Sequence, residues 1–393
     1  MKSAQTPRGI SSYIWQKAAW PRCQYDMQLL AAPLAEARQQ LGVLAGKAQA
    51  IGLARSDLQT LRQDILVQEA IATAAIEGQQ LDVAQVRSSV MRKLGFNDTG
   101  SSARDVDGLI EVMFDATNNL NAILDEDCLC RWQSALFPGG TSGIQRIQVG
   151  QFRSFAEPMQ IISGRAGKEV VHYRAPDSAR VNTDMAVFLA WFNAPAEQTH
   201  HVDGIIRAAI AHLWFETIHP FEDGNGRIGR AIIDRALAQD AQTQQLGVAG
   251  LISMSRTLQL HRKDYYDALH QAQTGDLDIT PWVSWFLKLF TTACQHTQQG
   301  ISQAILKAQF WSDHLHSNFN QRQRKTLQKL LDAGDGGFLG GMTAEKHSKI
   351  TGASKATATR DLADLLQKGA VISCGKGKAT KYLINVEGWN QLV

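Results

Sequence analysis

The segment IHPFEDGNGR, residues 218–227, gathers a histidine, two carboxylates, an asparagine and an arginine in one short run. A histidine near carboxylates suits acid–base catalysis or metal binding, whereas glycines beside arginines suit phosphate binding. Three kinds of site therefore have to be compared: a dinucleotide-binding loop, a metal centre and a phosphate-transfer site.

The dinucleotide hypothesis depends on the pattern Gly224-x-Gly226-x-x-Gly229. In a Rossmann fold this pattern follows a buried strand directly. The preceding apolar residues, from Ile205 to Phe215, recur at helical spacing instead, and no βα repeats surround them. The sequence argues against a dinucleotide site.

A metal centre would use His212 and His219, which lie seven positions apart with Glu216 between them. The HExxH pattern is absent, and Pro220 indicates that His219 stands at the end of a helix. We therefore interpret His212 as a structural histidine.

Phosphate chemistry accounts for more of the residues. The run GNGRIGRAIIDRAL predicts a helix that begins near Asn225 or Gly226, whose free N–H groups would attract an anion. Arg227 and Arg230 share a side of this helix and can clamp phosphate oxygens. Asp223 offers a ligand for Mg²⁺, and His219 can serve as general base for a hydroxyl nucleophile.

The stretch HPFEDGNGRIGR resembles the signature of Fic-domain proteins, HxFx(D/E)GNGRxxR, at every defining position. The resemblance implies transfer of AMP from ATP to a Ser, Thr or Tyr hydroxyl of the chain itself or of a target protein. It implies that His219 is the catalytic base and that Asp223 holds Mg²⁺, with Arg230 on the γ-phosphate. The nucleotide-binding residues implied are Gly224, Asn225, Gly226, Arg227, Ile228, Gly229 and Arg230. Kinase-like relatives carry Lys where this chain has Gly226, which favours AMP transfer.

Other segments resemble further parts of the same family. The predicted hairpin at 158–176 is similar to the flap that binds the target by strand addition. The run HRKDYYDAL, residues 261–269, resembles the segment lining the adenine pocket, which makes Tyr265 and Tyr266 candidates. TAAIEG, residues 73–78, resembles the inhibitory motif (S/T)xxxE(G/N), in which Glu77 would pair with Arg230 and keep ATP from binding productively.

The C-terminal segment 321–393 is basic, with twelve Lys and Arg against six Asp and Glu. Its pattern predicts helix, turn, helix and a hairpin, and resembles a winged-helix domain. Lys355, Thr357, Thr359 and Arg360 would begin the recognition helix and could contact DNA. Winged helices also dock proteins, so both partners stay open at this stage.

The predicted fold is mainly α: a Fic-type helical core with a β-hairpin flap, plus a small winged-helix domain. We expect an inhibitory helical region over 1–100, the catalytic core over 101–311 and the winged helix over 321–393. Five scattered cysteines and the lack of an apolar run of about 20 residues predict a cytoplasmic protein without membrane contact. A second copy of the chain is a candidate partner. Two alternative functions are a nucleotide-sensing DNA-binding regulator and an enzyme that removes AMP with the help of Glu77.

Overall fold

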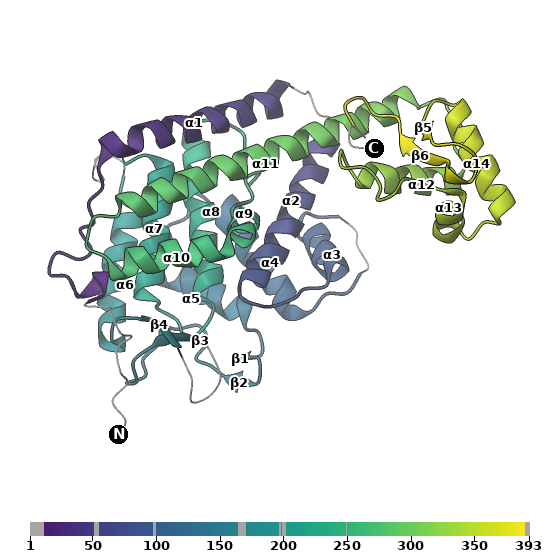
Figure 1. Ribbon diagram of the computed structural model, residues 1–393. Coiled ribbons are helices and arrows are strands. Elements are labelled where there is room, and N and C mark those ends of the chain that lie inside the picture. Colours follow the sequence, from purple (N-terminus) through teal and green to yellow (C-terminus); the bar gives the residue numbers. More distant parts are fainter. Residues whose placement is uncertain are drawn as a thin grey trace. The chain divides into compact units, whose positions relative to one another are not determined.

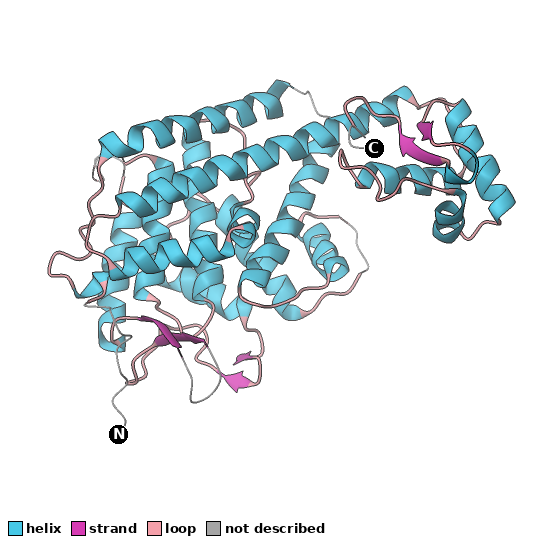
Figure 2. Ribbon diagram, in the orientation of Figure 1, coloured by secondary structure: helices cyan, strands magenta, loops and turns pink. Residues whose placement is uncertain are grey.

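The computed structural model describes residues 12–50, 55–96, 100–163, 170–195, 198, 202–248 and 250–389. They are mostly helical, and each of the three small sheets has two antiparallel strands (Figure 2). The fold class is confirmed as mainly α. Part of the predicted flap, residues 164–169, lies outside the described residues. The chain divides into two compact units, residues 1–298 and 299–393.

Two helices joined by the HPFEDG loop occupy the centre of the first unit: α7 (Gly204–Ile218) and α8 (Asn225–Thr243) (Figure 1). Twelve of the 15 residues of α7 are buried. A helix that is apolar on all sides has to lie inside the protein, which is the environment that α7 has. The Asp203 carboxylate caps α7 by accepting the N–H of Ile205 at 2.8 Å.

The other helices of the first unit pack against this pair or against one another. They are α1 (Met27–Ala50), α2 (Arg55–Ile76), α3 (Val83–Lys93), α4 (Arg104–Asn118), α5 (Glu126–Leu136), α6 (Ser178–Phe192), α9 (Met254–Leu260), α10 (Arg262–Thr274) and α11 (Thr280–Asp313), which continues into the second unit. Arg38 of α1 binds Asp240 of α8 at 2.6 Å and Asp203 at 2.7 Å. The first helix of the chain is thereby tied to both central helices.

Two short hairpins belong to the same unit. One comprises β1 (Thr141–Ser142) and β2 (Gln145–Arg146), and the other β3 (Gln160–Ser163) and β4 (Val170–Arg174). The second hairpin matches the predicted flap, whereas the first was not predicted. The 3₁₀ turn Ile14–Gln16 carries Trp15, which packs with Tyr13 and Tyr173 and donates to the Arg174 carbonyl at 2.9 Å.

The second unit contains α12 (Gln321–Asp332), α13 (Ala344–Thr351), α14 (Lys355–Gln367) and a hairpin of β5 (Val371–Cys374) and β6 (Lys381–Ile384). Its core includes Phe310 from the end of α11 together with Leu327 and Leu362. The elements follow the predicted order of helix, turn, helix and hairpin. Their interpretation as a winged-helix domain stays a prediction.

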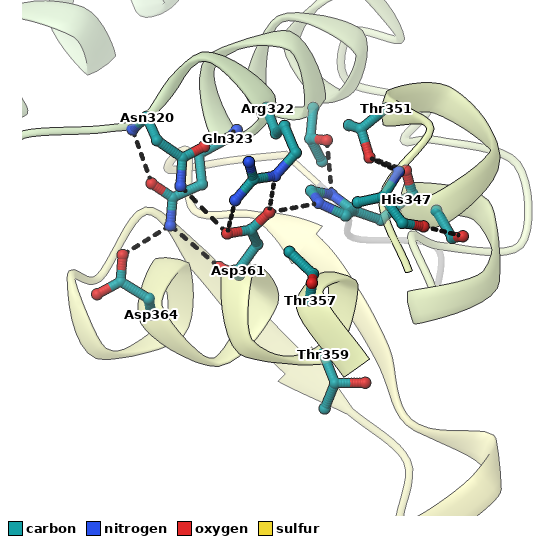
Figure 3. Close-up of polar contacts among 12 residues, drawn as sticks. Asn320, Arg322, Gln323, His347, Thr351, Thr357, Thr359, Asp361 and Asp364 are labelled. Carbon is teal, nitrogen blue, oxygen red and sulfur yellow. Dashed lines mark hydrogen bonds and ion pairs between the residues drawn. The ribbon is translucent and has the colours of Figure 1, made fainter. Parts of the chain in front are cut away.

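One carboxylate joins α12, α13 and α14 (Figure 3). Asp361 of α14 accepts hydrogen bonds from Arg322 Nε at 2.8 Å, Asn320 Nδ2 at 3.1 Å and His347 Nε2 at 3.1 Å. His347 is fully buried, and its Nδ1 lies 2.7 Å from the Thr326 hydroxyl. Hydrogen bonding from Arg322 is the main reason that the pKa of Asp361 falls to about 2.

No helix among the described residues is long and apolar enough to span a membrane.

Candidate functional site

The loop between α7 and α8 is held in shape by its own side chains. His219 ends α7 in the left-handed conformation with φ 52°, and Gly224 precedes α8 with φ 92°. Phe221 is fully buried, and the Asn225 amide bonds both the N–H and the C=O of Phe221, at 2.9 and 2.8 Å. The Asn225 side chain, expected to bind phosphate, therefore braces the loop in this structure.

The C-terminal carbonyls of α7 are bound by two side chains that the sequence did not single out. Arg153, which is 2% exposed, donates to the carbonyl oxygens of His219 at 2.8 Å and Ile218 at 3.1 Å. The Tyr173 hydroxyl donates to the carbonyl of Thr217 at 2.6 Å. A buried helix end needs such donors because its last carbonyls have no partner within the helix. Arg153 and Tyr173 thus fix the backbone that carries His219.

The imidazole of His219 is nearly buried, with its side chain 11% exposed. Burial, and then the positive charge of Arg153, lower the pKa of His219 to about 4. The ring is therefore neutral at pH 7 and able to accept a proton. Its Nδ1 atom has no hydrogen-bond partner among the described residues.

The start of α8 is the predicted anion site. The first helical hydrogen bond runs from Ile228 N–H to Gly224 C=O, so the N–H groups of residues 225–227 precede it. A Cβ atom at Gly226 would lie 2.2 Å from Oε1 of Glu77, so a larger residue at this position would displace the carboxylate. The Glu77 carboxylate thus lies at the helix N-terminus, where the sequence predicts a phosphate.

Arg230 is 2% exposed, and among the described residues its hydrogen bonds all go to the TAAIEG segment. Its Nε donates to the Thr73 hydroxyl at 2.6 Å, and one terminal nitrogen donates to the Thr73 carbonyl at 3.0 Å and to Glu77 at 2.8 Å. Burial disfavours charge on both groups, but their mutual attraction outweighs it. The pKa of Glu77 is therefore lowered and that of Arg230 raised. The predicted pairing of Glu77 with Arg230 is present.

Arg227 differs from Arg230 in its surroundings. Its guanidinium lies over the Phe137 ring at 4.7 Å, and its buried Nε has no hydrogen-bond partner in the described part of the chain. Burial lowers the pKa of Arg227. A buried donor left unpaired is costly, and a bound anion would satisfy it.

Asp223 borders the same region and is anchored at both oxygens. Oδ1 accepts the N–H of Gly224 at 2.5 Å, and Oδ2 accepts the hydroxyl of Ser142 in the unpredicted β1–β2 hairpin. The described residues contain no cluster of three or more His, Cys, Asp or Glu suited to a metal. A single carboxylate beside a phosphate site still fits Mg²⁺, which commonly takes one or two carboxylates plus substrate phosphates.

A cleft of about 630 Å³ borders the HPFEDG loop and the start of α8. Its lining includes Glu77, Arg104, Ser142, Asp223 and Arg227. The charged groups of the lining therefore face a space large enough for a small ligand.

The two tyrosines proposed for the adenine pocket lie in different environments. Tyr265 is 2% exposed, and its hydroxyl lies 2.9 Å from His212 Nε2. Tyr266 is 41% exposed and lies under Arg262, which is 5.6 Å from its ring centre. His212 itself is fully buried, as expected of a structural histidine. The adenine pocket stays a prediction.

Two parts of the chain match models of known protein families. Residues 123–237 match the model of the Fic/DOC family, and residues 13–96 match a domain of unknown function called DUF4172. The chain contains a Fic domain. Within it lie the HPFEDGNGR loop, both hairpins and Arg153, whereas Glu77 lies in the region that matches DUF4172.

Relatives of the Fic domain include two that are named protein adenylyltransferases. Fic-1 of Caenorhabditis elegans is 28% identical over 244 residues, which is 62% of this chain and 42% of that protein. The Culex quinquefasciatus protein is 25% identical over 230 residues, 58% of this chain and 40% of the relative. The chain thus spans less than half the length of these relatives.

The structural comparison supports the fold. The crystal structure of a Fic family protein from Desulfovibrio desulfuricans has a TM-score of 0.51 and 20% identity. The match covers 90% of this chain and 95% of that one. At this identity the similarity concerns the fold alone.

Proposed function

We propose that this chain is an autoinhibited protein adenylyltransferase, which transfers AMP from ATP to a side-chain hydroxyl of itself or of a target protein. One observation carries the proposal: His219 stands next to the start of α8, where Asp223 and Arg227 line a cleft together with Glu77, the partner of the buried Arg230. The base and the phosphate site thus lie within one loop. The similarity to named adenylyltransferases supports the same reaction. A cytoplasmic location, where ATP is available, is part of the proposal.

The triphosphate would bind at the N-terminus of α8. Backbone N–H groups and the helix dipole favour an anion there, and the unpaired Nε of Arg227 would donate to it. Arg230 would hold the γ-phosphate after release from Glu77. Asp223 would hold Mg²⁺, which would neutralise phosphate charge.

His219 would act on the acceptor. Its neutral imidazole can take the proton of a Ser, Thr or Tyr hydroxyl as the oxygen attacks the α-phosphorus. Arg153 and Tyr173 would keep the ring in position by holding the end of α7. The exposed residues Ile161 and Ile162 of β3 would help to receive the target segment.

The inhibited state follows from the position of Glu77. Its carboxylate binds Arg230 and lies against Gly226, so a phosphate at the helix start would compete with it for the same donors. ATP would then bind in a pose that does not suit in-line attack. Movement or removal of Glu77 would restore activity.

Removal of AMP is a second candidate activity, since the Glu77 carboxylate lines the cleft and could orient a water there. Incubating the chain with an AMP-modified protein tests this directly. Release of AMP by the wild type, but not by Glu77→Gly, would favour it.

The second unit is proposed to bind duplex DNA through α14, where Lys355, Thr359 and Arg360 are exposed. A gel shift that weakens steeply with added salt would support this role. No shift at low salt would favour protein docking.

The transferase proposal is tested with ATP labelled at the α-phosphate. We expect covalent label on the protein in the Glu77→Gly variant, and none in Glu77→Gly combined with His219→Ala. Equal labelling of the two variants would overturn the proposal.

A further inference from the structure

One buried acid near the catalytic loop has no part in the scheme above. Glu216 lies in the last turn of α7 and is 4% exposed. Its Oε1 atom has no hydrogen-bond partner among the described residues. Burying a carboxyl group without a hydrogen-bond partner costs free energy, so this oxygen needs a physical explanation.

Glu216 faces the proposed base. Its Oε2 lies 3.7 Å from Nδ1 of His219, three positions along the chain. That nitrogen also has no hydrogen-bond partner in the described structure. The unpaired Nδ1 of His219, which can donate, therefore stands slightly beyond bonding distance of Oε2 of Glu216, while Oε1 of the same carboxyl is the oxygen left without a partner. The backbone carbonyl of Glu216 also faces the ring and is the competing acceptor.

The neighbouring helix makes room for this carboxyl. A Cβ atom at Gly229 of α8 would lie 2.4 Å from Glu216 Oε1 and 3.1 Å from His212 Nδ1. The absence of a side chain at Gly229 therefore leaves space for the Glu216 carboxyl. Among the described residues, two histidines lie near the Glu216 carboxyl, His212 and His219. The other ionisable groups that interact with its charge are Arg230, Glu77, Tyr265 and Tyr173.

We propose that Glu216 is a positioning residue for the base, and that its carboxylate accepts a hydrogen bond from Nδ1–H of His219 during AMP transfer. The inference rests on the proposed function. In the step, the acceptor O–H bond breaks and its proton passes to Nε2 of His219. The oxygen bonds to the α-phosphorus, and pyrophosphate leaves with the electron pair of the broken P–O bond. The imidazolium that forms then donates Nδ1–H to Glu216.

The charge state of Glu216 gives this role a pH dependence. Burial raises the pKa of Glu216 to about 8, although Arg230 opposes the rise and Glu77 adds to it. Below pH 8 the carboxyl is mostly neutral and would stabilise the imidazolium little. Above pH 8 the carboxylate would make His219 a stronger base. The rate should therefore gain a component that increases as pH rises through the pKa of Glu216.

The kinetic test compares Glu77→Gly with Glu77→Gly/Glu216→Gln, because glutamine resembles the neutral acid in shape and charge. We expect similar kcat at pH 6 and about a tenfold lower kcat for the glutamine variant at pH 9, with KM for ATP little changed. Loss of Glu77 removes one charge that raises the pKa of Glu216, so the divergence should begin at or below about pH 8. Parallel pH profiles would overturn the proposal.

A second measurement needs no transferase activity. The ¹⁵N chemical shifts of the His219 ring are measured as a function of pH in the wild type and in Glu216→Gln, both of which keep Glu77. The His219→Ala variant identifies which signals belong to His219. We expect a step near pH 8 that is lost in Glu216→Gln. A step that survives in Glu216→Gln would come from another ionisable group and would overturn the proposal. So would the absence of a step in the wild type, which is the result expected if the backbone carbonyl of Glu216 were the partner of Nδ1. The two proposals can fail separately. If no variant transferred AMP, but the wild type showed the step and Glu216→Gln lost it, the proposed function would fail and the pairing of Glu216 with His219 would stand.

Discussion

Each unit of this protein contains an arginine–carboxylate pair, and the two pairs are built differently. Asp361 of the second unit is 7% exposed as a side chain and accepts from Arg322, Asn320 and His347 (Figure 3). Glu77 of the first unit is 36% exposed as a side chain and accepts only from Arg230 among the described residues. One carboxylate is enclosed by donors, and the other borders a cleft.

The difference separates a structural contact from an exchangeable one. Removing a partner from an enclosed pair leaves buried charge and costs stability. At the cleft the arginine is the buried partner, at 2% exposure, so an incoming anion could replace Glu77 without exposing new surface. We infer that the Glu77 pair can be exchanged for a ligand, whereas the Asp361 pair holds its unit together.

The largest expected effect comes from a residue that belongs to neither pair, the proposed base His219. His219→Ala in the Glu77→Gly background should lower AMP transfer by about 10²–10⁴-fold, because the general base is lost. ATP binding, measured by calorimetry, should be largely retained because the phosphate donors come from α8. Residual transfer above about a tenth of the parent rate would contradict the role of His219.

Breaking the exchangeable pair should activate the enzyme. Glu77→Gly should raise the rate of AMP transfer by about ten- to a hundredfold, since a charge-assisted contact of a few kcal/mol no longer opposes the γ-phosphate. Self-labelling with α-labelled ATP measures the change.

Two controls isolate the charge of Glu77. Glu77→Gln should activate as well, because the amide no longer attracts Arg230 as strongly. Adding Arg230→Ala to Glu77→Gly should erase the gain, because the freed arginine is what helps. A gain that survives without Arg230 would show that the pair is not the inhibitory contact.

Breaking the enclosed pair should affect stability instead. Asp361→Asn should lower the free energy of unfolding of the second unit by about 1–2 kcal/mol, since the acceptor stays but its charge is lost. AMP transfer in the Glu77→Gly background should stay within about twofold. Unfolding in denaturant measures the stability, and labelling with ATP measures AMP transfer. A tenfold change in AMP transfer would contradict a purely structural role for the Asp361 pair.

Lowering the pH should remove the stabilising contribution of the Asp361 charge in the same way. The pKa of Asp361 is lowered to about 2, so its stabilising effect is complete above the unfolded pKa of about 4. It is lost as pH falls from about 4 to 2. In Asp361→Asn this part of the pH dependence should be absent, which unfolding curves at pH 5 and pH 3 would measure.

Sequence reasoning was effective where function depends on neighbouring residues. The start of α8 was predicted near Asn225 or Gly226 from residues within one run, and the helix begins at Asn225. The contact of Glu77 with Arg230 spans 153 positions and was reached only through the resemblance to a known motif.

The groups that were missed act across the fold. Arg153 reaches His219 over 66 positions, and Ser142 reaches Asp223 over 81. The buried end of α7 implies that some donor must satisfy its carbonyls, but no local pattern says which one. Asn225 is expected to bind phosphate from the motif, and this stays a prediction. In the structure its side-chain amide binds the Phe221 backbone, a role that the sequence did not indicate.

The smallest expected effect separates two contacts of the same arginine. Thr73 binds Nε of Arg230 from the fully helical part of α2, whereas Glu77 lies one residue beyond the end of that helix. We therefore expect Thr73 to hold Arg230 both with and without ATP, and Glu77 to hold it only in the inhibited state. Thr73→Val, which keeps the shape and removes the hydroxyl, should change the wild-type rate of AMP transfer by less than about threefold. In the Glu77→Gly background it should lower the rate several-fold through a higher KM for ATP, because Arg230 loses a support and its buried Nε is left unpaired. If Thr73→Val alone activated the enzyme as strongly as Glu77→Gly, the hydroxyl would belong to the inhibitory contact, and exchange at Arg230 would involve the whole segment and not one carboxylate.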